Sequence, residues 1–335
     1  MAEKDKPEFN PNNTATGQLR VQIDKARADF QTNVDKARAD FERNVNQARL
    51  QYDQAAEKIK QRTGRDLIGA IIAGLIFAGL LLTSLLIFKV LFVPFAMVIL
   101  GICMAELATA MRFKNWMVDR SLNVALMLAV VPVTYFYGLP WGFSVLVGGT
   151  VVLALIALIP RPGSHMKGAS VPWKNMLATL FAQGYVGLLG LACVALVAQP
   201  DGQWWTITFL IIVVSVDIGA YAIGLNFGKH LMAPKISPKK TWEGFAGAAT
   251  AAIIAAVLCS WLMLNEPWWF GLIIGPIILF TAVWGDLGES QLKRIIGIKD
   301  MSNWLAGHGG FLDRLDSILP SALVMFVIYL IAHAG

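Results

Sequence analysis

The sequence predicts an all-α polytopic membrane protein of about nine transmembrane helices, preceded by an amphipathic helical extension. Of its 335 residues, 56% are hydrophobic and only 15% are charged, whereas soluble domains carry about 25% charged residues. Nine apolar runs approach the roughly 20 residues that a membrane-spanning helix requires. The three cysteines are widely spaced within these runs, which argues against a disulfide framework or a thiolate metal site.

Residues 1–66 are polar and contain an eleven-residue repeat. The copies DKARADFQTNV at 24–34 and DKARADFERNV at 35–45 are followed by a looser copy at 46–56. Because eleven residues make about three helical turns, the apolar positions of the copies fall on one stripe. We predict a cytoplasmic amphipathic helix whose stripe is solvated, self-associates or lies on the membrane surface. Nothing in this segment indicates catalysis.

The rest of the chain divides into N-terminal transmembrane helices at 67–200 and a catalytic transmembrane region at 201–335. The spans that the sequence predicts are 67–88, 90–110, 121–138, 141–159, 175–197, 204–225, 245–264, 268–285 and 317–334.

Basic residues lie on alternate loops, and this pattern predicts the orientation. The loops near 111–120, 161–174, 226–243 and 286–316 hold three or four Lys or Arg residues each, whereas the alternate loops hold only Lys89. By the positive-inside rule, the basic loops and the amino terminus lie in the cytoplasm. With nine spans the carboxyl terminus lies outside. The sequence thus predicts an integral protein of the inner (cytoplasmic) membrane with its active site on the cytoplasmic side.

Glu106 lies near the cytoplasmic end of the second predicted span. An ionisable residue at membrane depth invites a functional hypothesis. The same carboxylate could simply reach the interface, and the sequence leaves both alternatives open.

The third basic loop carries the motif SPKKTWEG at 237–244. Ser237 followed by Pro238 is typical of a helix start, with serine as the N-cap and proline at the first helical position. The free backbone N–H groups of such a start suit an anion such as phosphate. Lys239 and Lys240 add two ammonium groups. We therefore predict a phosphate site here, with a merely basic cytoplasmic loop as the alternative.

The loop at 286–316 concentrates charge between two predicted spans. If the preceding helix continues into it, Asp286, Ser290 and Lys293 lie at i, i+4 and i+7 on one face. A charged residue costs about 2.5–3.5 kcal/mol at the centre of a span. So many charged residues next to membrane spans indicate that they take part in a chemical reaction.

Three aspartates are predicted to form a metal site. Asp313 and Asp316 are three residues apart and share a helical face at the start of the last span. Carboxylates brought together with Asp286 would repel one another unless a hard cation lay between them, and Mg²⁺ takes oxygen ligands. An interfacial salt-bridge cluster around Arg314 is the structural alternative. Asp217, in the last turns of the sixth span, would need a lysine or a metal ion as its partner.

The remaining polar groups of this loop suit a bound polyphosphate. They are basic side chains, a histidine and a glycine pair that permits close backbone approach, namely Lys293, Arg294, His308, Gly309, Gly310 and Arg314. The sequence contains no GxxxxGK[ST] loop, GxSxG elbow or HExxH helix, so those three kinds of site are not supported.

These motifs resemble the signature of the phosphatidate cytidylyltransferase family, also called CDP-diacylglycerol synthases. The match runs without a gap over twenty-seven residues. Its positions are Ser290, Lys293, Arg294, Lys299, Asp300, Ser302, His308, Gly309, Gly310, Asp313, Arg314 and Asp316. Ala306 stands where the family usually has Pro, Gly or Ser, and SPKKTWEG is a second hallmark. The resemblance is clear over 205–335, weaker over 67–204 and absent from 1–66.

The resemblance implies a Mg²⁺-dependent nucleotidyltransferase of phospholipid biosynthesis. Its members convert CTP and phosphatidic acid into CDP-diacylglycerol and pyrophosphate, in a cytoplasm-facing cavity at the membrane surface. The residues that match Asp286, Asp313 and Asp316 are the family's metal-site positions. The resemblance also implies a homodimer and allows a second, monovalent cation. No nucleic-acid partner is expected.

Transfer between two anionic substrates depends chiefly on positioning and charge neutralisation. We expect the helix start at Ser237, with Lys239 and Lys240, to hold the leaving β- and γ-phosphates. The groups expected at the lipid phosphate or the α-phosphate are Lys293, Arg294 and Arg314, with His308 as a donor and Ser290, Gly309 and Gly310 as further binding positions.

Two other kinds of function are alternatives to this one. A CTP-dependent enzyme acting on another lipid phosphate, such as an ether-linked archaeal lipid, or a CTP-dependent polyprenol kinase would have similar needs. A transporter is the alternative from another class, since buried acids and broken helices also mark ion pathways. However, the acids cluster at the cytoplasmic ends of spans, and no inverted repeat is evident.

Overall fold

The computed structural model describes residues 67–159, 171–234, 236–302 and 309–334. The predicted repeat helix of residues 1–66 lies outside these ranges. The residues from Gly69 onward form one compact unit.

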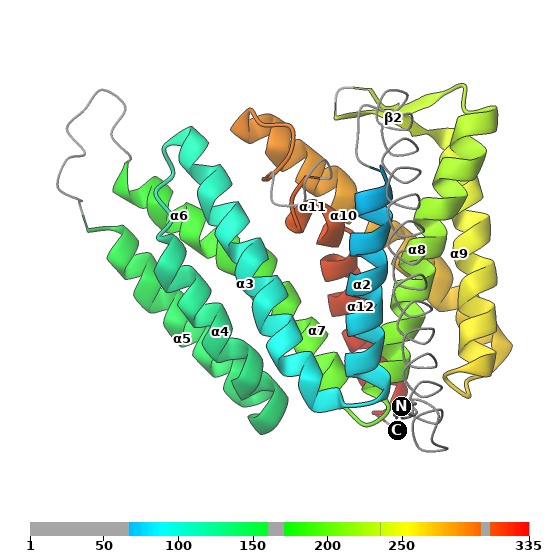
Figure 1. The fold of residues 1–335 in the computed structure, drawn as a ribbon, viewed down its shortest axis with the longest axis horizontal. Coiled ribbons are helices and arrows are strands. Elements are labelled where there is room, and N and C mark those ends of the chain that lie inside the picture. The colour runs from blue at the N-terminus through cyan, green and yellow to red at the C-terminus, as the bar shows by residue number, and fades with distance from the viewer. Residues whose placement is uncertain (1–66, 160–170, 235, 303–308, 335) are drawn as a thin grey trace, which may run out of the picture. The chain divides into compact units, whose positions relative to one another are not determined.

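Within the described residues the fold is almost entirely helical (Figure 1). Eight helical segments are long and apolar enough to cross a membrane, and the apolar helix α2 precedes them. The helices are α2 (Leu67–Leu86), α3 (Phe92–Met111), α4 (Arg120–Tyr137), α5 (Leu139–Ala157), α6 (Pro172–Ala182), α7 (Leu189–Ala198), α8 (Gly202–Phe227), α9 (Trp242–Leu262), α10 (Trp268–Ile296), α11 (Leu312–Leu315) and α12 (Ile318–Ala332). The short turns are η2 (Lys89–Leu91), η3 (Arg112–Lys114) and the π-helical η4 (Gln183–Leu188), which joins α6 to α7. The predicted all-α polytopic membrane fold is confirmed, and the chain is an integral membrane protein.

Helix α10 is longer than the span predicted at 268–285. It continues to Ile296 and ends at Gly297, whose φ of 89° is a left-handed conformation that favours glycine. No proline follows Asp286 before Gly297, and the single Gly288 does not interrupt the helix, so the polar sequence extends the apolar one. Asp286, Ser290 and Lys293 are therefore carried on one continuous helix, as the spacing predicted.

The predicted helix start at Ser237 is wrong. Strand β2 (Ser237–Thr241) pairs antiparallel with β1 (Leu231–Ala233), and the helix α9 begins only at Trp242. Its N-cap is Thr241, whose hydroxyl accepts a hydrogen bond from the N–H of Gly244 at 3.1 Å. Pro238 is tolerated because a two-stranded sheet has only edge strands. Thr241 supplies the N-cap that the motif predicted at Ser237, four residues earlier.

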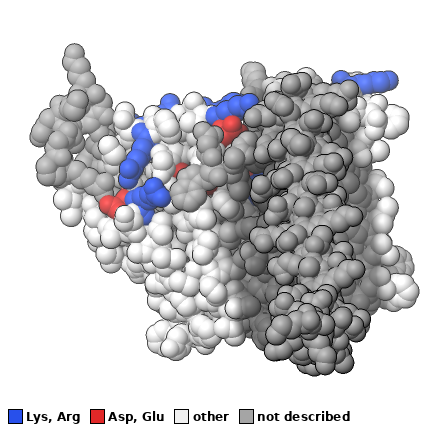
Figure 2. Space-filling model, viewed as in Figure 1, with Lys and Arg blue, Asp and Glu red and all other residues white. Residues whose placement is uncertain are grey.

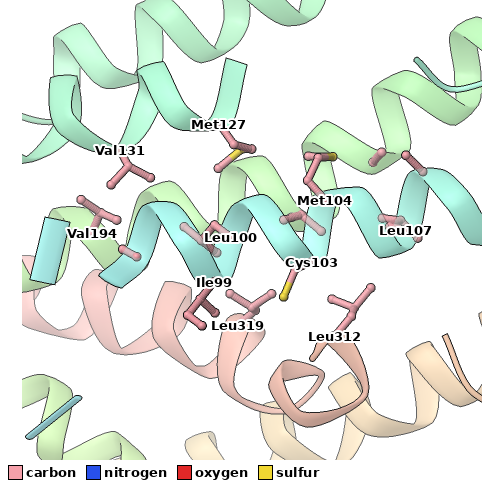
Figure 3. Close-up of a cluster of buried hydrophobic side chains, with 14 of the residues drawn as sticks. Ile99, Leu100, Cys103, Met104, Leu107, Met127, Val131, Val194, Leu312 and Leu319 are labelled. Carbon is pink, nitrogen blue, oxygen red and sulfur yellow. The ribbon is translucent and has the colours of Figure 1, made fainter. Parts of the chain in front are cut away.

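Helix α3 runs through the larger hydrophobic core and contacts α4, α6, α7 and α11. Its side chains Ile99, Leu100, Cys103, Met104 and Leu107 meet residues of four other helices (Figure 3). The facing side chains are Met127 and Val131 of α4, Val194 of α7, Leu312 of α11 and Leu319 of α12. This core places α3 against the start of α11, where the charged loop re-enters the bundle.

A second core joins α7, α8, α9, α10 and α12. Helices α8 and α9 approach closely because glycines face each other: a Cβ at Gly219 would lie 2.6 Å from the carbonyl oxygen of Gly247. The hairpin that connects them contacts both helices. It lies at the same end of the helices as α11 (Figure 1), so the two polar segments of the sequence meet there.

Candidate active site

Carboxylates from three separate parts of the chain line one cavity of about 240 Å³. Helix α8 provides Asp217, α10 provides Asp286, and the junction of α11 with α12 provides Asp313 and Asp316. The other lining residues are Lys293, Arg314 and Ser317. The structure thus brings together, around one space, four acids that are spread over a hundred residues of sequence.

The cavity lies at the basic end of the helices. Figure 2 shows Lys and Arg side chains gathered along the upper edge of the molecule, where Figure 1 places β2 and the end of α10. The remaining visible surface below that edge carries almost no charge (Figure 2). A charged rim above an apolar body is the arrangement expected of a site at the membrane surface.

Two lysines pair directly with cavity aspartates. Lys240 of β2 places its Nζ 2.6 Å from Oδ2 of Asp286, and Lys293 of α10 places its Nζ 2.8 Å from Oδ1 of Asp313. The second pair is the more buried, with side chains 14% and 9% exposed. Both sides of the cavity therefore already combine an anionic and a cationic group.

Asp313 is held by the backbone as well as by Lys293. Its Oδ2 accepts hydrogen bonds from the N–H groups of Gly310 at 2.7 Å and Met301 at 3.0 Å. Gly309 has a φ of 83°, and a Cβ there would lie 2.8 Å from the same oxygen. The glycine pair predicted to approach a phosphate is thus required by carboxylates of the protein itself.

Asp316 is buried at the C-cap of α11, and its Oδ1 accepts hydrogen bonds from the backbone N–H of Ser317 at 2.6 Å and from its hydroxyl at 3.2 Å. Helix α10 can approach this point because it carries Gly285 there. A Cβ at Gly285 would collide with the carbonyl oxygen of Asp316. The glycine before Asp286 therefore decides that the two aspartates share a cavity.

Glu289 is a member of this cluster that the sequence analysis did not single out. It is 1% exposed, and its carboxylate lies among other charged groups of the cluster. The nearest cation is Nζ of Lys293 at 3.6 Å, and Asp316 is a neighbouring acid. Its spacing of three residues from Asp286 and four from Lys293 was the signal that could have identified it.

The described residues contain no group of three or more acidic, histidine or cysteine side chains already gathered as a metal site. Two of the three predicted ligands, Asp286 and Asp313, form ion pairs with lysines. The chemistry of the cavity nevertheless fits a hard cation, because its anionic groups are all oxygen donors. The two carboxylate oxygens of Glu289 lie in the same cluster and add further donors of the required type.

Some of the predicted phosphate ligands lie beside the acids of the cavity, and others do not. Lys239 and Lys240 are neighbours on a strand, where successive side chains point to opposite faces; Lys240 meets Asp286, whereas Lys239 is exposed. Ser237 lies at the start of that strand, away from the helix start at Trp242.

The loop residues divide in the same way. Arg314 lines the cavity, and Arg294 is exposed near the end of α10. Ser290 donates to Oδ1 of Asp286 at 3.3 Å. His308 lies outside the described residues.

Glu106, for which the sequence left two alternatives open, is buried inside the protein. Its side chain is 3% exposed. Its carboxylate accepts three hydrogen bonds from the loop that leads into α11.

Comparison with known proteins identifies the family of the chain. The model of the cytidylyltransferase family matches residues 68–332. A phosphatidate cytidylyltransferase of Mycobacterium tuberculosis is 41% identical over 169 residues, which cover 50% of this chain and 49% of that protein. One of Mycobacterium leprae is 40% identical over 187 residues, covering 53% and 60%, and one of Brucella suis is 33% identical over 196 residues, covering 56% and 71%. The chain thus spans about half the length of the mycobacterial relatives that it matches.

Proposed function

The chain belongs to the cytidylyltransferase family, and on that premise we propose that it transfers CMP from CTP to phosphatidic acid. The products are CDP-diacylglycerol and pyrophosphate. The proposal is supported by the names of relatives that are 33–41% identical. The single structural observation that carries it is the cavity in which Asp286, Asp313 and Asp316 lie beside Lys293 and Arg314.

In the proposed reaction a phosphate oxygen of the lipid attacks the α-phosphorus of CTP in line. A new bond forms between them, the bond from the α-phosphorus to the bridging oxygen of the β-phosphate breaks, and pyrophosphate leaves with that electron pair. The attacking oxygen is already an anion, so the step needs no general base. The difficulty is the approach of two highly negative groups, which positioning and charge neutralisation overcome.

The cationic side chains of the cavity are suited to this task. Lys240 lies on the hairpin side and is assigned to the leaving phosphates, while Lys293 and Arg314 are assigned to the α-phosphate or the lipid phosphate. Both lysines now bind aspartate oxygens. Each can exchange that anionic oxygen for a phosphate oxygen, because an ammonium group binds either as a point charge.

We assign Mg²⁺ to Asp286, Asp313 and Asp316, with Glu289 as an additional carboxylate beside them. When bound there, the ion would neutralise phosphate oxygens of both substrates. Asp286 supplies its carboxylate from α10, whereas Asp313 and Asp316 supply theirs from α11 and its C-cap. Asp313 is also held in place by two backbone N–H groups.

The size of the cavity suits the reacting phosphates alone. Pockets for whole drug-sized ligands are about 300–1,000 Å³, whereas this cavity is about 240 Å³. The cytidine and the acyl chains would therefore lie outside it, with the chains in the lipid and the nucleotide arriving from the water. The basic loops favour a cavity at the cytoplasmic surface of the inner membrane, with the amino terminus in the cytoplasm and the carboxyl terminus outside.

A homodimer and a second, monovalent cation belong to the same proposal. The oligomeric state can be measured by light scattering of the purified protein in detergent. The second cation can be tested by comparing turnover in potassium, sodium and large organic cations at constant ionic strength.

The direct test of the function uses the purified full chain in lipid vesicles. With labelled CTP, phosphatidic acid and Mg²⁺, we expect a labelled liponucleotide and release of pyrophosphate. Phosphorylated isoprenoid and ether-lipid acceptors, and unphosphorylated polyprenol, are offered in parallel. Preference for one of these acceptors would replace the assignment of phosphatidic acid, and the absence of any labelled product would refute cytidylyl transfer.

A further inference from the structure

The carboxylate of Glu106 joins helix α3 to the start of α11. Its Oε1 accepts hydrogen bonds from the hydroxyl of Ser302 at 2.5 Å and from the N–H of Phe311 at 3.0 Å. Its Oε2 accepts one from the N–H of Leu312 at 2.9 Å. Both oxygens of a buried charge are therefore bonded, which explains how a carboxylate is tolerated at this depth.

This arrangement caps a very short helix from outside. The first N–H groups of any helix lack partners within it, and an anion is favourable beside them. Helix α11 has only four residues, Leu312–Leu315. Its cap comes from Glu106, which lies 205 and 206 residues earlier in the chain than the two residues that it bonds.

Two further contacts show that this junction is specific. A Cβ at Gly310 would lie 2.7–2.9 Å from the carboxylate atoms of Glu106, so glycine is what allows the carboxylate to approach. On the other side, the ring of Phe311 packs against Phe77 of α2, with ring centroids 5.8 Å apart. The segment that enters α11 is thus fixed both through its backbone and through its aromatic side chain.

The same segment carries two of the three aspartates assigned to the metal site. Asp313 follows the capped residue Leu312 directly, and Asp316 ends the helix. Glu106 is not among the residues that line the cavity. Any effect on the reaction must therefore pass through the position of α11.

We propose that Glu106 is a positioning residue: its carboxylate fixes α11 and thereby holds Asp313 and Asp316 in the geometry that the transfer reaction needs. The inference rests on the proposed function, because it assigns a role within that reaction. It differs from a purely structural role in one respect. Loss of Glu106 raises the Mg²⁺ concentration that every folded molecule needs for its reaction. A loss of stability lowers only the number of active molecules.

The first test is Glu106→Gln in the full chain. Whichever way the amide turns, its NH₂ faces the N–H of Phe311 or of Leu312, so at least one hydrogen bond is replaced by opposed donors. We expect the Mg²⁺ concentration for half-maximal rate to rise about 10- to 100-fold, as is typical when a supporting hydrogen bond behind a metal ligand is lost. The KM for CTP measured at saturating Mg²⁺ should change far less.

Hydrogen exchange gives a readout that does not depend on activity. In Glu106→Gln the amides of residues 309–316 are expected to exchange faster, while those of α3 and of the body of α12 remain protected. The matched control is Thr109→Val, one turn along the same helix, whose hydroxyl donates to the carbonyl of Ala105 within that helix at 2.7 Å. This control is expected to match the wild type in both measurements.

A second variant keeps the proposal testable if Glu106→Gln does not fold. Gly310→Ala leaves α3 unchanged and pushes the carboxylate away, so it should raise the Mg²⁺ requirement in the same way. The double variant should be little worse than the more impaired single one, because both changes break the same contact. A wild-type Mg²⁺ requirement in either single variant, or unchanged exchange at 309–316, overturns the inference. A wild type that forms no liponucleotide refutes the proposed function instead, and the exchange experiment then decides separately whether Glu106 anchors the segment.

Discussion

Gly285 of α10 lies directly against the backbone carbonyl of Asp316. A Cβ at Gly285 would overlap that oxygen and would come within 3.0 Å of the side chain of Pro320. No side chain therefore separates α10 from the junction of α11 with α12 at this level. The contact sets the distance between Asp286, the next residue of α10, and the other acids of the cavity.

Gly285→Ala should separate the two helices and impair the site. Inserting a methyl group into a close-packed contact typically costs about 1–3 kcal/mol, and a misplacement of about 1 Å can cost about 100-fold in rate. We expect a lower Tm and at least a tenfold lower turnover of CTP. The matched control is Gly288→Ala on the same helix, where a Cβ has no atom within 4 Å. That variant should keep its activity, and equal activity of both variants would show that the close contact is unimportant.

Lys240 and Lys239 should differ sharply although they are neighbours. Lys240→Gln removes the ammonium group 2.6 Å from Asp286, and a hydrogen bond to a charged group is worth about 1.5–3 kcal/mol. We expect kcat/KM for CTP to fall about tenfold or more. Lys239→Gln, on the opposite face of the strand, should change it less than about threefold. Similar losses in both variants would mean that the hairpin binds phosphate with both lysines.

Asp313→Asn and Asp316→Asn should each abolish turnover while the protein still inserts and folds. Each change removes a negative charge from the group of ligands assigned to Mg²⁺, and loss of such a ligand is expected to cost at least about 100-fold. Asp119→Asn is the control, because asparagine caps a helix about as well as the aspartate that caps α4. Full activity in either purified cavity variant would contradict the metal assignment.

Glu289→Gln should lower the turnover of the enzyme without lowering its thermal stability. In the described structure the carboxylate is 1% exposed and lies beside the acid Asp316, and burying two acidic groups together is destabilising. We expect a Tm that is equal or a few degrees higher, together with a loss of turnover of about tenfold or more. Thermal unfolding and liponucleotide formation measure the two effects. A lower Tm with normal turnover would show that Glu289 serves only the fold.

Much of the fold could be read from the sequence, because spans are local features of about 20 residues. The shared face of Asp286 and Lys293 followed from helical spacing once α10 continued to Ile296. The helix start was misplaced because Ser237-Pro238 and Thr241 both carry capping chemistry. Only the pairing of β2 with β1 decides between them, and a strand pair is not a local property.

The supporting contacts could not be predicted for the same reason. Glu106 is separated by about 200 residues from the amides that it binds, and no spacing rule connects them. The role of Gly285 depends on which helix crosses α10 at that level. The sequence predicts close backbone approach at Gly309 and Gly310. The groups that approach them, Asp313 and Glu106, are identified only once α3 and α11 are in contact.

Helix α10 continues for eleven residues beyond its predicted apolar span. At 1.5 Å per residue this adds about 16 Å of polar helix, which carries charged side chains of the site. Under the proposed function, a diacylated molecule would be modified in place, without being pulled out of its leaflet.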